Sequence, residues 1–168
     1  MEKFSTPLLI ERPLIYASIY QLSTIVFGSE GLAKLSTGGN HDEFDSLRVR
    51  HEVAQASKLL IEIAVVLRNL MDSSTWPMDP IHDIRVENHP ELSTGVLTQV
   101  GKKPEELSFR GSCNKLIHAD QISFGMSSLE GKLDFLDGTV MLYGKRGKHN
   151  WAANINVSKF VRMAVRQL

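Results

Sequence analysis

Three polar side chains recur at four-residue steps in the stretch 104–120, which is predicted to be a helix. Successive helical residues are rotated by about 100°, so Arg110, Asn114 and His118 are expected on one face. Arginine offers a charged planar fork for phosphate, asparagine both donates and accepts hydrogen bonds, and histidine exchanges protons near neutral pH. This set suits metal-independent phosphodiester chemistry, with His118 as general acid or base and the other two holding the phosphate.

The run 113–118, Cys-Asn-Lys-Leu-Ile-His, resembles the signature of the HEPN superfamily (higher eukaryotes and prokaryotes nucleotide-binding). In that signature an arginine followed by a polar residue, often asparagine, precedes a histidine by somewhat more than one helical turn. Asn114 and His118 match the pattern, whereas Cys113 occupies the usual arginine position. Arg110, one turn earlier on nearly the same face, is the candidate replacement. A long helical hairpin before the motif also fits this all-helical superfamily.

The resemblance implies a bacterial protein that binds or cleaves RNA. Active members are metal-independent endoribonucleases, commonly of toxin–antitoxin or antiphage defence systems, and they work as dimers that bring two motifs together. RNA, a homo-oligomer and no cofactor are therefore implied. Because Cys113 replaces the arginine, a protein degenerate in catalysis is the open alternative to an active nuclease. More loosely, the run 114–119 together with 142–144, 146–148 and Trp151 is similar to a family of small uncharacterised bacterial proteins, which implies no activity.

The same residues also have a structural interpretation. Asn114 and His118 would hydrogen-bond each other or the following loop and fix the junction between the helix and a sheet. The chain would then be a non-enzymatic interaction or scaffold protein that uses its helical hairpin for homo- or hetero-oligomerisation. The position of His118 distinguishes the two interpretations, because a nuclease needs it with Arg110 on a basic cleft, whereas a scaffold would bury it beneath the sheet.

Two other fragments bear on the motif. Cys113 and His118 are five positions apart, which on a helix leaves about 140° beyond a full turn and directs the side chains apart. Cys113 is therefore predicted to be a small buried residue and not a nucleophile. The pair Arg68-Asn69 begins like the motif, but no histidine follows at the required distance.

A basic hairpin is the second candidate interface. The formal net charge is zero, yet the chain from Gly138 onwards has six Lys or Arg residues and no Asp or Glu. Lys145, Arg146 and Lys148 are predicted at the tip of a hairpin and are expected to bind nucleic acid, with Trp151 as a nearby aromatic ring. The alternative is that these charges protect a sheet edge from aggregation.

Length and composition predict one folded domain. The 168 residues are 42% hydrophobic and 23% charged, close to globular averages. The single cysteine, Cys113, excludes an internal disulfide and favours a cytoplasmic setting, and the apolar run 59–67 is too short to span a bilayer. No metal site is predicted, because the loop residues with suitable donors lack a helical spacing and a fourth ligand: His82, Asp83 and His89.

The pattern of apolar residues predicts an α+β fold in which the helices come first. Helices are expected at 13–28, with an alternative end at 35, and at 42–71, where a long apolar stripe needs a partner helix. We expect these two to pair antiparallel. A short helix at 93–100 and the helix 104–120 complete a helical part of about 13–120.

The second part, about 121–168, is predicted to be a small antiparallel sheet and a closing helix. The closing helix covers 157–167 and is capped by Asn156. The prolines of 73–91 indicate an irregular connection with a short strand at 84–86. The strands of the sheet are expected at 122–124, 132–136, 139–143 and 151–155.

Overall fold

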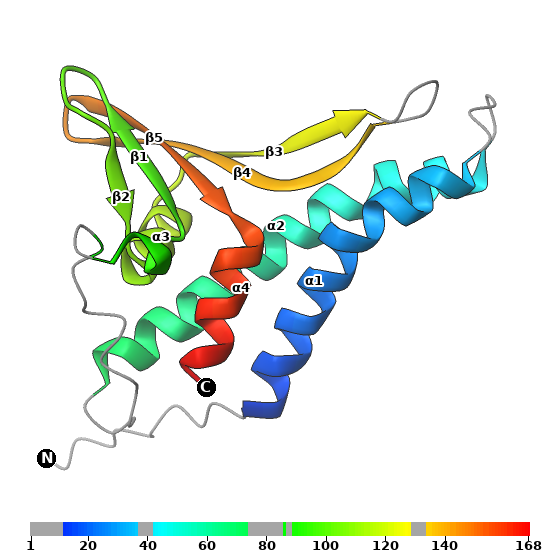
Figure 1. Cartoon of the computed structure of the whole chain (residues 1–168), viewed down its shortest axis with the longest axis horizontal. Helices are drawn as coiled ribbons and strands as arrows, with labels where there is room; N and C mark the ends of the chain where they lie inside the picture. Colours follow the sequence, from blue (N-terminus) through cyan, green and yellow to red (C-terminus); the bar gives the residue numbers. More distant parts are fainter. Residues whose placement is uncertain (1–11, 37–41, 74–85, 87–88, 129–133) are drawn as a thin grey trace, which may run out of the picture.

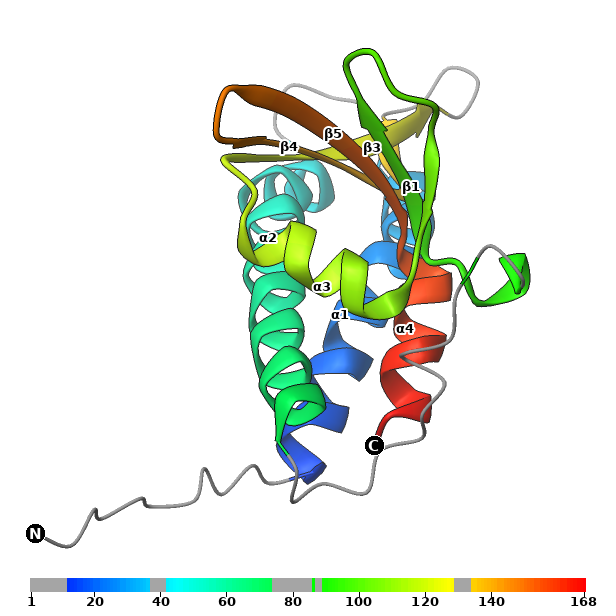
Figure 2. The same cartoon turned by 90° about the vertical axis from the view of Figure 1, so that its left-hand side faces the viewer.

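The computed structural model of the chain describes residues 12–36, 42–73, 86, 89–128 and 134–168. Within them the fold has two layers, with a five-stranded antiparallel sheet lying over a layer of helices (Figures 1 and 2). The predicted α+β class is confirmed, as is the order of a long helical hairpin, an antiparallel sheet and a final helix. None of the helices in the described ranges is long and apolar enough to cross a membrane.

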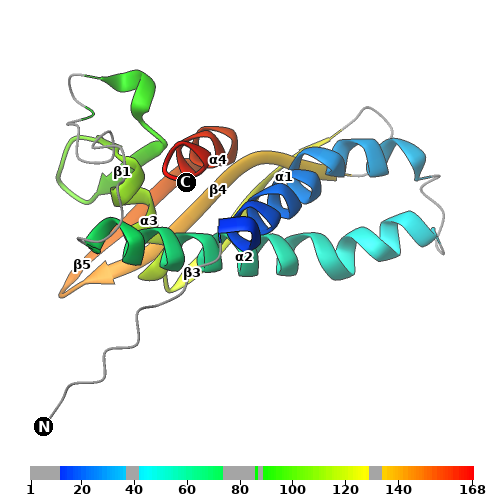
Figure 3. The ribbon, with the colours of Figure 1, turned by 90° about the horizontal axis from the view of Figure 1, so that it is seen from below.

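The helical hairpin consists of α1 (Arg12–Leu35) and α2 (Glu43–Asp72), close to the expected 13–35 and 42–71. The two helices run antiparallel, since Ser18 of α1 bonds Glu62 of α2 at 3.1 Å while Ser29, later in α1, bonds Glu52, earlier in α2, at 2.8 Å. Figure 3 shows them side by side beneath the sheet. The facing stripes supply the largest share of the core: Ile15, Ile19, Leu22, Val26, Ala56, Leu60, Ile63 and Leu67.

The sheet has the order β2-β1-β5-β4-β3. Its strands are β1 (Gly95–Gln99), β2 (Glu105–Leu107), β3 (Gln121–Ser128), β4 (Asp134–Arg146) and β5 (His149–Asn156). Side chains alternate between the faces, so that Trp151, Ala153 and Ile155 of β5 are buried against the helices. The residues between them face the opposite side of the sheet.

Two short helices close the space between the layers. In α4 (Val157–Arg166) the Asn156 side chain accepts a hydrogen bond from the Lys159 N–H at 3.0 Å, as predicted from the sequence. The helix α3 (Phe109–Ile117) lies beneath β1 and β5 and beside α2 (Figure 2). The Phe109 and Phe160 rings, with centroids 5.1 Å apart, join α3 to α4.

A buried polar cluster joins the helical hairpin to the sheet. The Ser29 hydroxyl donates to a Glu52 carboxylate oxygen and accepts from the Leu136 N–H at 3.1 Å. Arg48 pairs with Glu52 at 3.3 Å and also donates to the Asp134 carbonyl. Because buried polar groups are costly unless they are bonded, these contacts fix where β4 crosses the hairpin.

The expected helical part of about 13–120 is wrong in its second half. Residues 95–99 form a strand and not a helix, and β2 occupies 105–107, where the predicted helix 104–120 was to begin. The reason is tertiary, because β1 pairs with β5, a partner more than fifty residues later. The helix begins at Phe109 because the Ser108 side chain accepts from the Gly111 N–H at 3.1 Å.

The strands expected at 132–136 and 139–143 are one continuous strand over their described residues. Asp137 and Gly138 resemble a turn, but the Asp137 carboxylate accepts from the Thr139 N–H at 2.8 Å and Gly138 takes φ +84° within the strand. A glycine tolerates this backbone and lets the strand bend without ending. The strand expected at 84–86 lies mainly outside the described residues.

Replacing Ser29 with alanine tests the buried polar cluster. Ser29→Ala leaves the Leu136 N–H and the Glu52 carboxylate each without this partner, so we expect the free energy of unfolding to fall by about 1–3 kcal/mol. Urea unfolding of both proteins measures the change. Ser23→Ala is the matched control, since the Ser23 hydroxyl donates to the Ile19 carbonyl of its own helix, and it should change stability by less than about 0.5 kcal/mol. Equal losses in the two variants would contradict a special role for the cluster.

Candidate nucleic-acid interface

The helix α3 has one buried and one polar face. Phe109, Cys113 and Leu116 point into the core. Ser112 is buried as well, and its hydroxyl lies 2.7 Å from that of Thr94, so the buried face is fixed by a polar contact as well as by packing. Asn114, Lys115 and His118 are left on the side that faces the strand ends.

The predicted trio Arg110, Asn114 and His118 is only partly brought together. Arg110 turns to the end of α2, where it donates to the Asp72 carboxylate at 2.7 Å and to the Met71 carbonyl at 3.0 Å. Asn114 and His118 line a cleft between α3 and the sheet, and Arg110 is not among its lining residues. His118 is exposed at the C-terminal end of α3, and so it is not buried beneath the sheet.

Arg68 of α2 takes the place beside Asn114 that Arg110 was expected to fill. Its Nε donates to Asn114 Oδ1 at 2.7 Å, and its Nη1 pairs with the Asp72 carboxylate. Arg68 also lines the cleft, with Asn114 and His118. An arginine, an asparagine and a histidine therefore share one concave surface, although the arginine lies 46 positions before the asparagine.

The cleft, here called the basic cleft, has a volume of about 740 Å³. Among the described residues that line it, five are Lys or Arg and one is a glutamate, which makes its surface strongly cationic. Lys145 and Arg146 of the predicted hairpin lie here, whereas Lys148 is not among the lining residues. The full lining is Arg68, Leu97, Gln99, Lys102, Glu105, Gly111, Asn114, Lys115, His118, Lys145, Arg146 and Trp151.

Trp151 forms part of the wall of the basic cleft and is not a free stacking platform. Only 5% of it is exposed, and the Lys115 Nζ lies over its ring, 4.2 Å from the centroid. Across the hairpin, a Cβ atom on Gly144 would approach the indole to 2.2 Å, so glycine is required there. Burial, followed by the charge of Arg146, lowers the pKa of Lys115, while Glu105 opposes the shift.

The structure gives Cys113 a structural place. It is fully buried, and desolvation raises the pKa of its thiol to about 12 despite the nearby charges of Arg68 and Arg110. A thiol of this kind is protonated at neutral pH and shielded from solvent, in agreement with the prediction of a small buried residue. Of the loop residues considered as metal ligands, His89 lies 3.0 Å from Glu91, while His82 and Asp83 fall outside the described residues.

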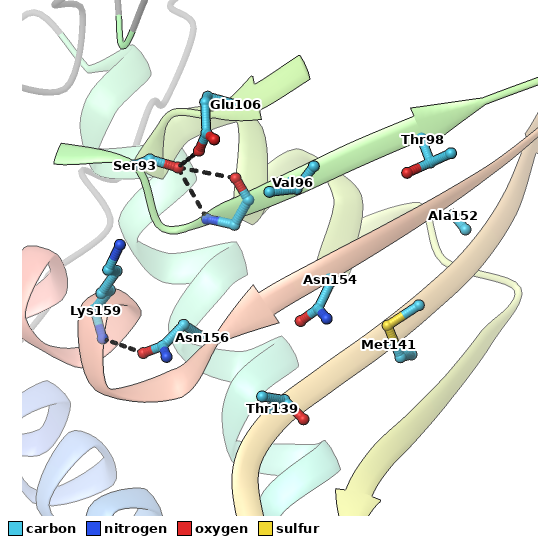
Figure 4. A pocket seen from close by; sticks show the side chains of 11 residues that line it. Ser93, Val96, Thr98, Glu106, Thr139, Met141, Ala152, Asn154, Asn156 and Lys159 are labelled. Atoms are coloured by element: carbon cyan, nitrogen blue, oxygen red, sulfur yellow. Dashed lines mark hydrogen bonds between the residues drawn. The ribbon is translucent and has the colours of Figure 1, made fainter. Parts of the chain in front are cut away.

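A second groove, on the outer face of the sheet, has a different character (Figure 4). Its volume is about 560 Å³. The charged residues that line it are one lysine, Lys159, and one glutamate, Glu106, so their charges cancel. Several of its polar groups are already engaged within the fold. Ser93 bonds Glu106 and the Gly95 carbonyl, and Asn156 caps α4 (Figure 4). The basic cleft is therefore the better candidate for an anionic ligand.

Residues that the sequence did not indicate complete the basic cleft. The pair Arg68-Asn69 is not followed by a histidine at the distance that the motif requires, and Lys102 and Lys115 had no signal beyond their charge. The fold alone gathers them, by placing α2, the β1–β2 turn and α3 around one cavity. No protein-family model matches the chain, and neither curated proteins nor solved structures provide a significant match.

The contact between α2 and α3 predicts a pH dependence of stability. Hydrogen bonds from Arg68 and then Arg110 hold the pKa of Asp72 below its ordinary value of 3.8. A carboxylate whose pKa is lower in the folded state stabilises the fold above the unfolded pKa, and this contribution is lost as the pH falls through the folded pKa. Asp72→Asn should therefore lower the thermal midpoint at neutral pH, and its difference from wild type should shrink at pH values below 3.8.

Differential scanning fluorimetry over a pH series measures both midpoints. Asp120→Asn is the control, because Asp120 is an exposed carboxylate on the turn after α3. It should leave the midpoint close to wild type at neutral pH. A difference between Asp72→Asn and wild type that stays constant with pH would contradict the proposed contribution.

Proposed function

We propose that the chain binds RNA in the basic cleft and cleaves it by metal-independent chemistry. The observation that carries the proposal is the presence of Arg68, Asn114 and His118 on the same concave surface as Lys145 and Arg146. The nuclease interpretation expected Arg110 and His118 on a shared basic cleft, but Arg110 does not line the cleft, and we propose that Arg68 takes its role. In line with the resemblance, a toxin–antitoxin or antiphage system is the proposed setting.

The charges of the cleft suit a polyanion. Each RNA phosphate carries one negative charge, and Lys and Arg side chains that contact phosphates release bound counterions. Arg68 Nη2 can donate to a phosphate, while the bonds of Nε to Asn114 and of Nη1 to Asp72 set the orientation of the guanidinium. A guanidinium held in this way loses little freedom when a ligand binds.

The proposed reaction is an internal transfer at one phosphate. His118 removes the proton of a ribose 2′-hydroxyl, the 2′-oxygen forms a bond to phosphorus, and the bond from phosphorus to the 5′-oxygen breaks. Arg68 stabilises the negative charge that builds on the phosphate oxygens. Lys115, whose lowered pKa makes it a better proton donor than an ordinary lysine, protonates the departing 5′-oxygen. The products are a cyclic phosphate and a 5′-hydroxyl.

Cleavage of single-stranded RNA in EDTA tests the proposal. His118→Ala should lower the rate by about 10²–10⁴-fold, the range expected for loss of a general base, while RNA binding persists. His51→Ala replaces an exposed histidine of α2 that is not among the cleft residues and should leave the rate unchanged. Equal rates for wild type and His118→Ala, or no cleavage by either, would refute the catalytic proposal.

Arg68 and Arg110 form a matched pair for the same assay. Both pair with Asp72, and each bonds the facing helix, Arg68 through Asn114 and Arg110 through Asp72. Replacing either therefore loses a contact between α2 and α3, but only Arg68 lines the basic cleft. We expect Arg68→Ala to reduce cleavage at least about tenfold more than Arg110→Ala, because a donor to the developing charge contributes several kcal/mol. Thermal midpoints of the two variants control for stability. Similar rates in both would favour a purely structural role for Arg68.

An exposed apolar face supports a second candidate function, in which the helical hairpin mediates oligomerisation. Leu47, Ile61 and Val65 lie on the side of α2 opposite its buried stripe and are 51%, 39% and 38% exposed. Apolar side chains gathered on one face are typical of protein–protein contacts. Such an interface agrees with the paired motifs that the HEPN resemblance implies, and it also suits the scaffold alternative.

Solution mass tests the apolar face. We expect light scattering to give twice the chain mass of 18.8 kDa, and Ile61→Glu to give the chain mass, because a charge at the centre of an apolar contact opposes its burial. Arg162→Glu, a charge reversal at an exposed position of α4, should leave the dimer intact. A wild-type monomer would exclude self-association through this face.

A further inference from the structure

A second basin adjoins the basic cleft at the end of the sheet. This turn basin, with a volume of about 440 Å³, is lined by Gln99, Val100, Gly101, Lys102, Arg146 and His149. It shares Gln99, Lys102 and Arg146 with the basic cleft, so the two cavities adjoin. The surface available to a ligand therefore extends beyond the residues assigned to the reaction.

The register of the sheet explains why the turn basin exists. β1 and β5 are neighbours, with Gln99 opposite Trp151, and β4 pairs with β5 as far as Arg146 opposite His149. The β1–β2 turn and the β4–β5 turn therefore lie at the same end of the sheet. Their side chains form the two sides of the basin.

The chemistry of the turn basin matches phosphate. Lys102 and Arg146 are cations, His149 can donate hydrogen bonds, and the described residues that line the basin include no carboxylate. The only aromatic ring of the Phe, Tyr or Trp type among the described lining of either basin is Trp151, whose face is covered by Lys115. Binding must then depend on the backbone phosphates and not on stacking of bases.

We infer that the basic cleft and the turn basin together hold an extended single strand of several nucleotides. Binding depends little on base sequence, and the turn basin takes phosphates on one side of the reacting bond. This inference rests on the proposed function of the basic cleft. Volumes of about 740 and 440 Å³ are those of pockets that admit individual small ligands, which suits separate nucleotides and not the stacked body of a duplex.

Fluorescence anisotropy in EDTA with the His118→Ala protein, which keeps labelled RNA intact, tests the inference. We expect oligouridylates of six and twelve nucleotides to bind at least about tenfold more tightly than a dinucleotide, because more phosphates reach cations. Hexamers of uridine and adenosine should agree within about threefold, and a twelve-base-pair RNA duplex should bind more weakly than the single strand.

Lys102→Ala, added to His118→Ala, tests the lysine that the two basins share, while the dependence on strand length tests the turn basin itself. Lys102→Ala should weaken binding of the hexamer and reduce the slope of log affinity against log salt by about 0.7, the value for one phosphate contact on a single strand. Lys148→Ala, a cation on the β4–β5 turn that lines neither basin, is the matched control and should change the hexamer affinity much less.

The outcomes separate the two proposals. Equal affinities for the dinucleotide and the longer strands, a duplex bound as tightly as the single strand, or equal effects of Lys102→Ala and Lys148→Ala would overturn the extended site while leaving RNA binding in the basic cleft intact. Absence of binding by every oligonucleotide would overturn the proposed function itself.

Discussion

One carboxylate at the end of α2 holds two arginines that come from different elements. Asp72 accepts from Arg68 of its own helix and from Arg110 of α3, and Arg68 in turn donates to Asn114. The chain of contacts orients α3 against the end of α2. The position of every side chain that α3 contributes to the basic cleft depends on this contact.

This dependence follows from the size of α3. A helix of nine residues is not stable in isolation, so its place must be fixed from outside. Ser108 caps its first turn, the Phe109 ring packs on α4, and the asparagine near its end meets Arg68. These three contacts fix the helix, and its polar face remains available to a ligand in the basic cleft. The polar face therefore consists of side chains positioned by contacts made elsewhere on the helix.

The parts of the fold that follow from local signals could be predicted, and those that follow from distant pairing could not. The long apolar stripe of α2 and the Asn156 cap of α4 are visible in the sequence because neighbouring residues create them. The strand at 95–99 is not, since its partner β5 is far along the chain. The site divides in the same way, because Asn114 and His118 share a helix while Arg68 reaches them only through the packing of α2 on α3.

The burial of Cys113 makes the chain convenient for chemical labelling. It is the only cysteine in the sequence, it has no exposed surface, and its thiol has a pKa of about 12. Maleimides and similar reagents attack exposed thiolates, so they will pass over the native residue in the folded protein. A single cysteine introduced on the β1–β2 turn or the β4–β5 turn would hold a fluorophore or a crosslinker at one defined position. The native thiol would not have to be removed.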